Sequence, residues 1–209
     1  MSDEFVRVNI AVKPSELVAQ QAIELSQKLS DKSKTYFVLD GQNYFPHLTI
    51  YSPEFPKNKL DGVLSTIESI CATTKSFESP FLDIQSHDGY VDVEVELNDS
   101  FQNLHEIIVE KLNPLREGHL REKYTVEANL AELTETQRQN IKKYGYPDVM
   151  EIYRPHLTLI RLENSDEALS LAKNIKWNTE KLTVGSVAAF TMSSHGTCSG
   201  LIKEFSLKP

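Results

Sequence analysis

Apolar and polar side chains alternate over two stretches of the chain, residues 5–12 and residues 91–97. Alternation with a period of two puts every second side chain on one face, which is typical of a strand buried on one side. A Ser-His-Asp-Gly turn precedes the second stretch and predicts a hairpin over 81–97. The further predicted strands lie within 36–39, 44–51, 153–160 and 181–207.

Four other stretches repeat their apolar side chains every three or four residues. That spacing lines the apolar groups along one side of a helix. The Pro14-Ser15 pair is a start signal for the first helix, and Asn98 to Ser100 supply cap candidates for the third. The four predicted helices run through Val18–Leu29, Leu60–Ile70, Phe101–Leu115 and Ala168–Ile175.

Residues 117–150 differ from the rest of the chain because they are polar and follow no long period. One short helix is expected there, opened by a capping box between Thr134 and Gln137 and ended by Gly145. We interpret the segment as an insertion that lies over the surface or over the mouth of a site.

One motif occurs twice: YFPHLTIY at 44–51 returns as YRPHLTLI at 153–160. Each copy is followed by a predicted helix, a strand and a Ser-His turn, and then by a closing strand. The motif histidine and the turn histidine are separated by nearly the same number of residues in both copies. Matching order and spacing indicate two copies of one supersecondary unit. The predicted units are residues 44–97 and 153–207.

The turn histidines, His87 and His195, need separate treatment. His195-Gly196-Thr197 also fits the pattern His-x-Thr, but it aligns with the Ser-His-Asp-Gly turn and lacks apolar flanks. Both histidines are therefore interpreted as turn residues, with the alternative that a turn lines the site.

The repeated motif places a histidine and a threonine on the same face of a strand. His47 and Thr49 share one face, as do His156 and Thr158, while the leucines between them face the opposite way. Two imidazoles across a groove can act as general base and general acid, and the threonine hydroxyls can hydrogen-bond phosphate oxygens. The prediction is a catalytic pair, His47 and His156, with Thr49 and Thr158 as phosphate ligands. No metal or other cofactor is predicted, because His-x-Thr offers too few ligands for a metal ion. The alternative for either histidine taken alone is a structural role, which is more common for a single histidine on a strand.

Four further side chains are candidates for substrate binding. Arg154 is expected on the face of the second motif histidine, and Tyr51 on that of the first motif threonine. The other two flank the second motif, and ordinary packing is the alternative for each tyrosine. Arg161 falls on the opposite face by parity and is left out. The candidates are Arg154, Tyr51, Tyr146 and Tyr153.

Composition narrows the partners. The chain has 209 residues, 40% of them hydrophobic, and a formal net charge of −8, which argues against a broad surface for duplex nucleic acid. The start Met-Ser-Asp-Glu lacks the features of a secretory signal, and no apolar run is long enough for a membrane span. Cys71 and Cys198 lie far apart in sequence, so free thiols in a cytoplasmic location are expected. We expect a monomer acting on a small nucleotide or RNA end.

The paired motifs, His47-Leu48-Thr49-Ile50 and His156-Leu157-Thr158-Leu159, resemble those of the 2H phosphoesterase superfamily, also called LigT-like or the 2′-5′ RNA ligase family. The resemblance implies an α+β, bilobal fold with two pseudo-symmetric antiparallel sheets flanked by helices around a central cleft, over one domain from 1 to 209. It also implies metal-independent hydrolysis of 2′,3′-cyclic phosphates or 2′-5′ linkages.

Two alternatives stay open, a non-catalytic nucleotide-binding module and 2′-5′ end-joining of RNA by the reverse reaction. The long separation of the motifs is a departure from compact members. The sequence QRQNIKKYGYPDVMEIYRPHLTL, at the end of the inserted segment, is similar to a subgroup associated with phosphonate metabolism. The natural substrate is therefore left open.

Overall fold

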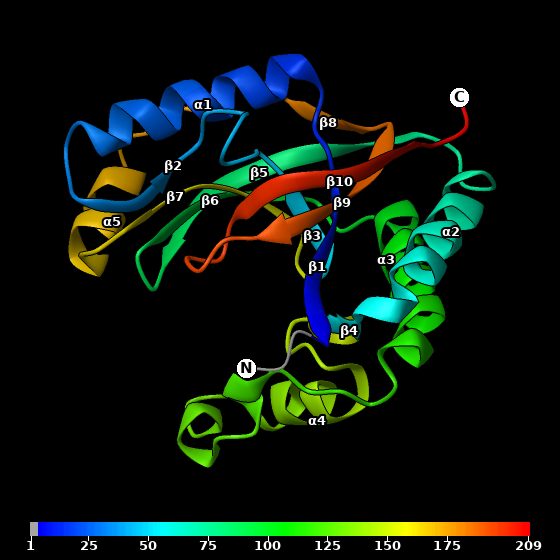
Figure 1. Ribbon diagram of the computed structural model, residues 1–209. Coiled ribbons are helices and arrows are strands. Elements are labelled where there is room, and N and C mark those ends of the chain that lie inside the picture. The colour runs from blue at the N-terminus through cyan, green and yellow to red at the C-terminus, as the bar shows by residue number, and fades with distance from the viewer. Residues whose placement is uncertain (1–3) are drawn as a thin grey trace.

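Residues 4–209 are described by the computed structural model, in which strands form two antiparallel sheets (Figure 1). Sheet 1 has the strand order β10-β9-β1-β3, with β4 also pairing with β1. Its strands are β1 (Phe5–Val12), β3 (Leu48–Tyr51), β4 (Glu54–Pro56), β9 (Ser186–Met192) and β10 (Cys198–Ser206).

Sheet 2 has the order β2-β7-β6-β5-β8. The β5–β6 hairpin turns at Asp88 and Gly89, which both have positive φ, as the Ser-His-Asp-Gly signal predicts. A side chain at position 89 would also collide with the carbonyl oxygen of Leu162. The strands of sheet 2 are β2 (Thr35–Val38), β5 (Phe77–His87), β6 (Tyr90–Val95), β7 (His156–Leu162) and β8 (Lys181–Val184).

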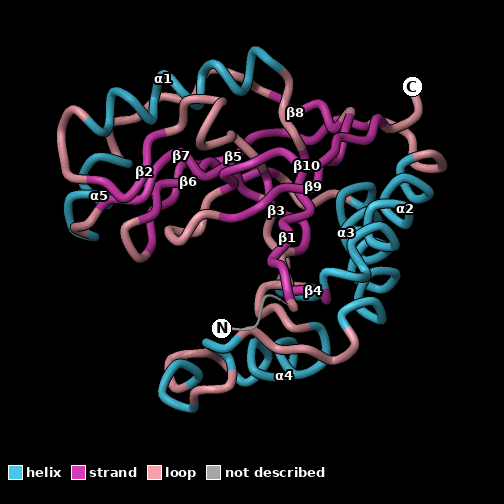
Figure 2. The backbone as a smooth tube through the Cα atoms, in the orientation of Figure 1, coloured by secondary structure: helices cyan, strands magenta, loops and turns pink. Residues whose placement is uncertain are grey.

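Helices lie outside the sheets (Figure 2). Helices α1 (Glu16–Ser30) and α5 (Ser165–Ala172) pack against sheet 2, whereas α2 (Leu60–Cys71) and α3 (Asp99–Leu112) pack against sheet 1. Helix α4 (Glu135–Tyr144) stands apart with its neighbouring loops, near β4 (Figure 1). Short 3-10 turns occupy Lys57–Lys59, Asn113–Arg116, Glu122–Tyr124, Glu127–Leu130 and Met150–Ile152.

The helix ends follow the signals in the sequence. Ser15 caps α1, and Asn98 caps α3 by accepting a hydrogen bond from the backbone N–H of Phe101. Thr134 and Gln137 form the predicted capping box of α4, and Gly145 ends that helix with φ of 71°. The predicted helices and strands are thus confirmed, with boundaries shifted by a few residues.

Both sheets contribute to one continuous apolar core. Ile10 and Leu48 of sheet 1 and Val93 and Leu157 of sheet 2 are all fully buried in it. The predicted α+β class with two antiparallel sheets is confirmed. No helix within residues 4–209 is both long and apolar enough to span a bilayer.

The two repeated units interlace between the sheets. After the first motif, β3 and α2 belong to sheet 1, but the hairpin β5–β6 joins sheet 2. After the second motif, β7 and α5 belong to sheet 2, but β9 and β10 join sheet 1. Each motif strand therefore shares a sheet with the hairpin of the other unit.

Candidate functional site

A cleft opens between the two sheets. Its inner pocket has a cavity volume of about 400 Å³, and a wider outer pocket of about 1260 Å³ adjoins it through shared lining residues. Sheet 1 supplies β1, β3 and the β9–β10 turn; sheet 2 supplies β6, β7 and the β5–β6 turn. The third contributor is the inserted segment 117–150, which lines both pockets.

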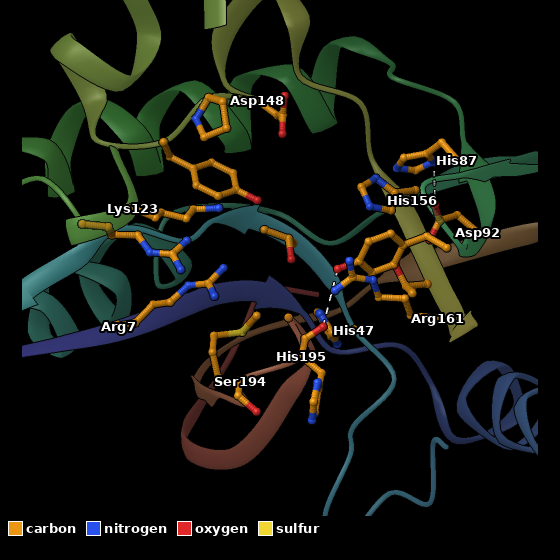
Figure 3. Close-up of a pocket in the computed structure, with 18 of the residues that line it drawn as sticks. Arg7, His47, His87, Asp92, Lys123, Asp148, His156, Arg161, Ser194 and His195 are labelled. Atoms are coloured by element: carbon orange, nitrogen blue, oxygen red, sulfur yellow. Dashed lines mark hydrogen bonds and ion pairs between the residues drawn. The ribbon is translucent and has the colours of Figure 1, made fainter. Parts of the chain in front are cut away.

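All four residues of the paired motifs line the inner pocket. His47 and Thr49 come from sheet 1, and His156 and Thr158 from sheet 2. Figure 3 shows His47 and His156 on different strands bordering the same pocket. Two segments 109 residues apart in sequence are thus brought to one place, although their catalytic roles stay a prediction.

Both motif histidines are held in the same way. The Nδ1 atom of His47 lies 2.7 Å from the carbonyl oxygen of Phe45, and that of His156 lies 2.8 Å from the carbonyl oxygen of Arg154. A carbonyl oxygen only accepts, so Nδ1 carries the proton in the neutral imidazole. Each Nε2 is therefore left to exchange a proton with a ligand.

The environments of the two imidazoles differ. His47 is 6% exposed, while His156 is only half-buried. Burial lowers the pKa of His47 to about 4; the Phe45 carbonyl opposes this shift, and His156 and Arg7 add to it. At neutral pH the free protein therefore holds His47 as an uncharged base.

The hydroxyl of Thr49 is oriented by a neighbour on β1. The side-chain amide of Asn9 donates to Thr49 Oγ1 over 2.9 Å and also approaches the thiol sulfur of Cys198 at 3.2 Å. Because the amide occupies a lone pair of the hydroxyl oxygen, the Thr49 proton can be donated elsewhere. An anion in the inner pocket would be a suitable acceptor.

A β-bulge follows the threonine in both motifs. In the β1–β3 pairing Tyr51 lies opposite Ile10 and Thr49 opposite Ala11, which leaves Ile50 as the extra residue. In the β6–β7 pairing Leu159 is extra in the same way. A bulge reverses the alternation of faces beyond it.

The bulges correct two predictions made by parity. Tyr51 does not face the pocket: its side chain is fully buried, and its hydroxyl donates to the Tyr144 carbonyl oxygen over 2.5 Å. It is therefore withdrawn as a base-stacking residue. Arg161, which parity excludes, lines both pockets instead.

Arg161 is clamped between two tyrosines. Its guanidinium carbon lies 4.8 Å from the ring centroid of Tyr36 and 4.7 Å from that of Tyr90. Its Nε is buried without a hydrogen-bond partner among the described residues. A rigid cation at the edge of the inner pocket can bind an anionic group (Figure 3).

The other candidates lie farther out. Tyr146 lines both pockets, whereas Arg154 and Tyr153 line only the outer one. The Arg154 guanidinium pairs with Glu94 at 2.9 Å. Tyr153 is 6% exposed and donates its hydroxyl to the Thr49 carbonyl oxygen over 3.1 Å, so it supports the strand of the first motif.

Both turn histidines, His87 and His195, line the inner pocket. The alternative interpretation, that these turns line the site, therefore fits better than a turn role alone. His87 Nδ1 lies 3.4 Å from a carboxylate oxygen of Asp92, which is buried opposite Thr158. His195 stacks on Tyr36 with ring centroids 5.4 Å apart. The sequence signal that could have placed both turn histidines in the pocket was their equivalent position in the two repeated units.

Three cations of the inner pocket were missed altogether: Arg7, Arg121 and Lys123. Arg7 lies on the polar face of the first predicted strand, and this position in the sequence pattern could have identified it as a pocket residue. The other two belong to the inserted segment, where no periodicity indicates which side chains turn inward.

The described residues, 4–209, contain no group of three or more His, Cys, Asp and Glu side chains able to hold a metal ion. Cys71 and Cys198 are both free and buried.

The arrangement of sheets and helices is the fold of E. coli LigT and of related solved structures. TT0787 of Thermus thermophilus superposes with a TM-score of 0.62 at 16% identity, over 97% of this chain and 98% of that one. E. coli LigT in complex with phosphate gives a TM-score of 0.55 at 12% identity, over 99% and 100%. At such identities the likeness concerns the fold.

Residues 55–197 match the family described as "Protein of unknown function (DUF1045)". That match covers more than half of the chain, which therefore belongs to the DUF1045 family. No curated protein sequence matches it.

Proposed function

We propose that this protein is a phosphodiesterase that hydrolyses 2′,3′-cyclic phosphates or 2′-5′ linkages of nucleotides and RNA ends without a metal ion. The main observation behind the proposal is the pair of histidines, each with Nδ1 on its own backbone and Nε2 free, bordering one pocket with two threonines. E. coli LigT, whose fold is similar, has been crystallised with phosphate and with 3′-AMP.

In the proposed reaction the scissile phosphate lies between the motifs. Thr49 and Thr158 donate hydrogen bonds to its non-bridging oxygens, where charge accumulates in the transition state. One imidazole removes a proton from water as the water oxygen attacks phosphorus. The other protonates the leaving ribose oxygen as its bond to phosphorus breaks, so the product is a monophosphate.

His47 is the better candidate for the base. Its pKa, lowered to about 4 by burial, keeps it unprotonated at neutral pH. His156 is more exposed, which leaves it the role of general acid toward the leaving oxygen.

The cleft favours small substrates. An inner cavity of about 400 Å³ is within the usual range for small-molecule pockets. Residues of the inserted segment border the cleft, and the chain carries a net charge of −8. Cyclic nucleotides and the last nucleotides of an RNA are therefore better candidates than long RNA.

The test is hydrolysis of nucleoside 2′,3′-cyclic phosphates and 2′-5′ dinucleotides in the presence of chelator. We expect a monophosphate product and a bell-shaped dependence of kcat/KM on pH. His47→Ala and His156→Ala should each reduce kcat by about 10²- to 10⁴-fold, the usual contribution of a general acid or base.

Matched variants of one threonine control for misfolding. Thr49→Ala should reduce kcat roughly 10²-fold or more, whereas Thr49→Ser keeps the hydroxyl and should retain most of the rate. Circular dichroism checks that all variants are folded. Turnover that persists in the His47→Ala, His156→Ala double variant would refute the proposal, and nucleotide binding without turnover would favour a binding module.

A further inference from the structure

Arg7, Arg121 and Lys123 line one end of the inner pocket; we call them the cationic cluster. Arg7 belongs to β1, and the other two lie at the start of the inserted segment. Figure 3 shows Arg7 and Lys123 on one side of the pocket and His47 and His156 on the other. The cluster is therefore separate from the paired motifs but open to the same cavity.

The charges of the cluster are poorly compensated. Within residues 4–209, Arg7 has no carboxylate partner within 4.0 Å; its Nε donates to the Ser52 hydroxyl over 3.2 Å. Lys123 has no ion pair there either, and its ammonium lies 4.7 Å from the ring centroid of Tyr124. Two cations that face a pocket without a carboxylate in ion-pair contact are electrostatically unfavourable unless something anionic binds them.

Arg121 is only partly neutralised. Its Nε lies 3.7 Å from Glu54 Oε1, and the other oxygen of the same carboxylate, Oε2, lies 2.9 Å from His119 Nε2. Its Nη1 is buried and has no hydrogen-bond partner within the described residues. A buried donor left without an acceptor costs free energy, so the site is built to receive one.

The cations also disfavour one another. Burial and then Arg121 lower the pKa of Arg7, and burial, Arg121 and Arg7 lower the pKa of Lys123 to about 8. Asp148 lines the same pocket and opposes the shift of Lys123. A bound anion would remove the repulsion and hold Lys123 protonated.

The cluster is close to the proposed scissile phosphate. Arg7 and Asn9 are two residues apart on one face of β1, about 7 Å along the strand. Asn9 is the residue that hydrogen-bonds Thr49. A second anion at the cluster would thus be linked to the first by something the size of one sugar, not by several nucleotides.

We propose that the cationic cluster binds a second, non-scissile phosphate carried by the substrate, so that the preferred substrate is a cyclic phosphodiester that also bears a terminal phosphomonoester. This inference rests on the proposed function and specifies its substrate class. The phosphate oxygens accept hydrogen bonds from Arg7, Arg121 and Lys123, and no bond is made or broken there.

The experiment compares adenosine 2′,3′-cyclic phosphate with the same compound phosphorylated at its 5′ oxygen. Wild-type protein should prefer the 5′-phosphorylated compound by roughly tenfold or more in kcat/KM, the value of one charge-assisted contact. The ratio should fall towards one in Arg7→Gln and in Lys123→Ala. Lys142→Ala, on the exposed surface of α4 and outside both pockets, is the control and should leave the ratio unchanged.

A binding measurement separates the two proposals. Calorimetry should show that adenosine 3′,5′-bisphosphate binds roughly tenfold more tightly than 3′-AMP, and that Lys123→Ala removes this gain. Equal affinities, or a gain that survives both cluster variants, would overturn the inference whether or not turnover is seen. If the gain is present but neither cyclic compound is hydrolysed, the phosphodiesterase proposal fails while the second phosphate site stands.

Discussion

Two imidazoles, His47 and His105, are buried and hold no charge at neutral pH. Burial lowers the pKa of each from 6.5 to about 4. A group whose pKa is lower in the folded state takes up its proton first in the unfolded state. The free energy of unfolding is therefore highest above pH 6.5 and decreases as pH falls from 6.5 towards 4.

Acid should destabilise the protein in that window. At pH 5 each of these histidines lowers the free energy of unfolding by about 2 kcal/mol relative to pH 7.5, since one pKa unit corresponds to about 1.4 kcal/mol. Urea unfolding at both pH values measures this difference. His105→Gln removes one titrating group and should shrink the difference by about half.

The comparison uses the change between two pH values, so a constant loss of stability in the variant cancels. An equal change in wild type and His105→Gln would show that His105 does not titrate as its burial implies. A larger residual change would point to buried groups other than His47.

At the scale of elements, the bulge in β3 is held by a contact from α3. His105 Nδ1 lies 3.0 Å from the carbonyl oxygen of the extra residue, Ile50, and so donates to it. Its Nε2 accepts from the backbone N–H of Met150 over 2.8 Å. Met150 has φ of 59°, a left-handed conformation that this bond helps to retain. One side chain thus connects the first motif with the approach to the second.

His105→Leu tests that connection. The change removes the partner of the carbonyl oxygen of buried Ile50 and that of the half-buried N–H of Met150, so we expect a loss of about 2–4 kcal/mol in the free energy of unfolding. Chemical denaturation measures it, and Asn103→Ala on the exposed side of α3 is the control, with an expected change within about 0.5 kcal/mol. A loss no larger than that of the control would mean that the bulge does not depend on His105.

Local sequence signals predicted most elements and missed the bulges. The capping box at Thr134 and the turn at Asp88-Gly89 are determined by nearby residues, so the sequence reveals them. A bulge depends on the partner strand and on supports such as His105, which lie far along the chain. Parity therefore placed His47 and Thr49 on the pocket face but failed beyond each bulge, so that Tyr51 was misplaced after Ile50 and Arg161 after Leu159.

At the scale of the molecule, strand pairing was the feature that sequence could not supply. The repeat shows two similar units, and the simplest expectation is one lobe for each. The structure instead exchanges the hairpins, because β6 pairs with β7 and β9 pairs with β1. Nothing in either unit alone distinguishes pairing within it from pairing with the other.

The shared core and exchanged hairpins predict one cooperative unfolding transition. Ile10→Ala in sheet 1 should destabilise the protein by about 2–5 kcal/mol. Trp177 is the single tryptophan and packs beside Phe81 of sheet 2, with ring centroids 4.9 Å apart. In Ile10→Ala, the unfolding midpoint followed by Trp177 fluorescence should move to lower denaturant by the same amount as the midpoint followed by circular dichroism. A fluorescence midpoint that stays in place would show that the sheets unfold separately.

The exchange of hairpins has a consequence for synthesis on the ribosome. β1 is synthesised early, but its partner β9 begins only at Ser186. Sheet 1, which carries His47, therefore cannot be completed until most of the chain has been synthesised. In sheet 2, which carries His156, the paired strands β6 and β7 are synthesised sooner. During that interval β1 has an open edge, and such edges recruit other chains. We therefore expect chaperones to bind most strongly to nascent chains whose synthesis has paused before Ser186.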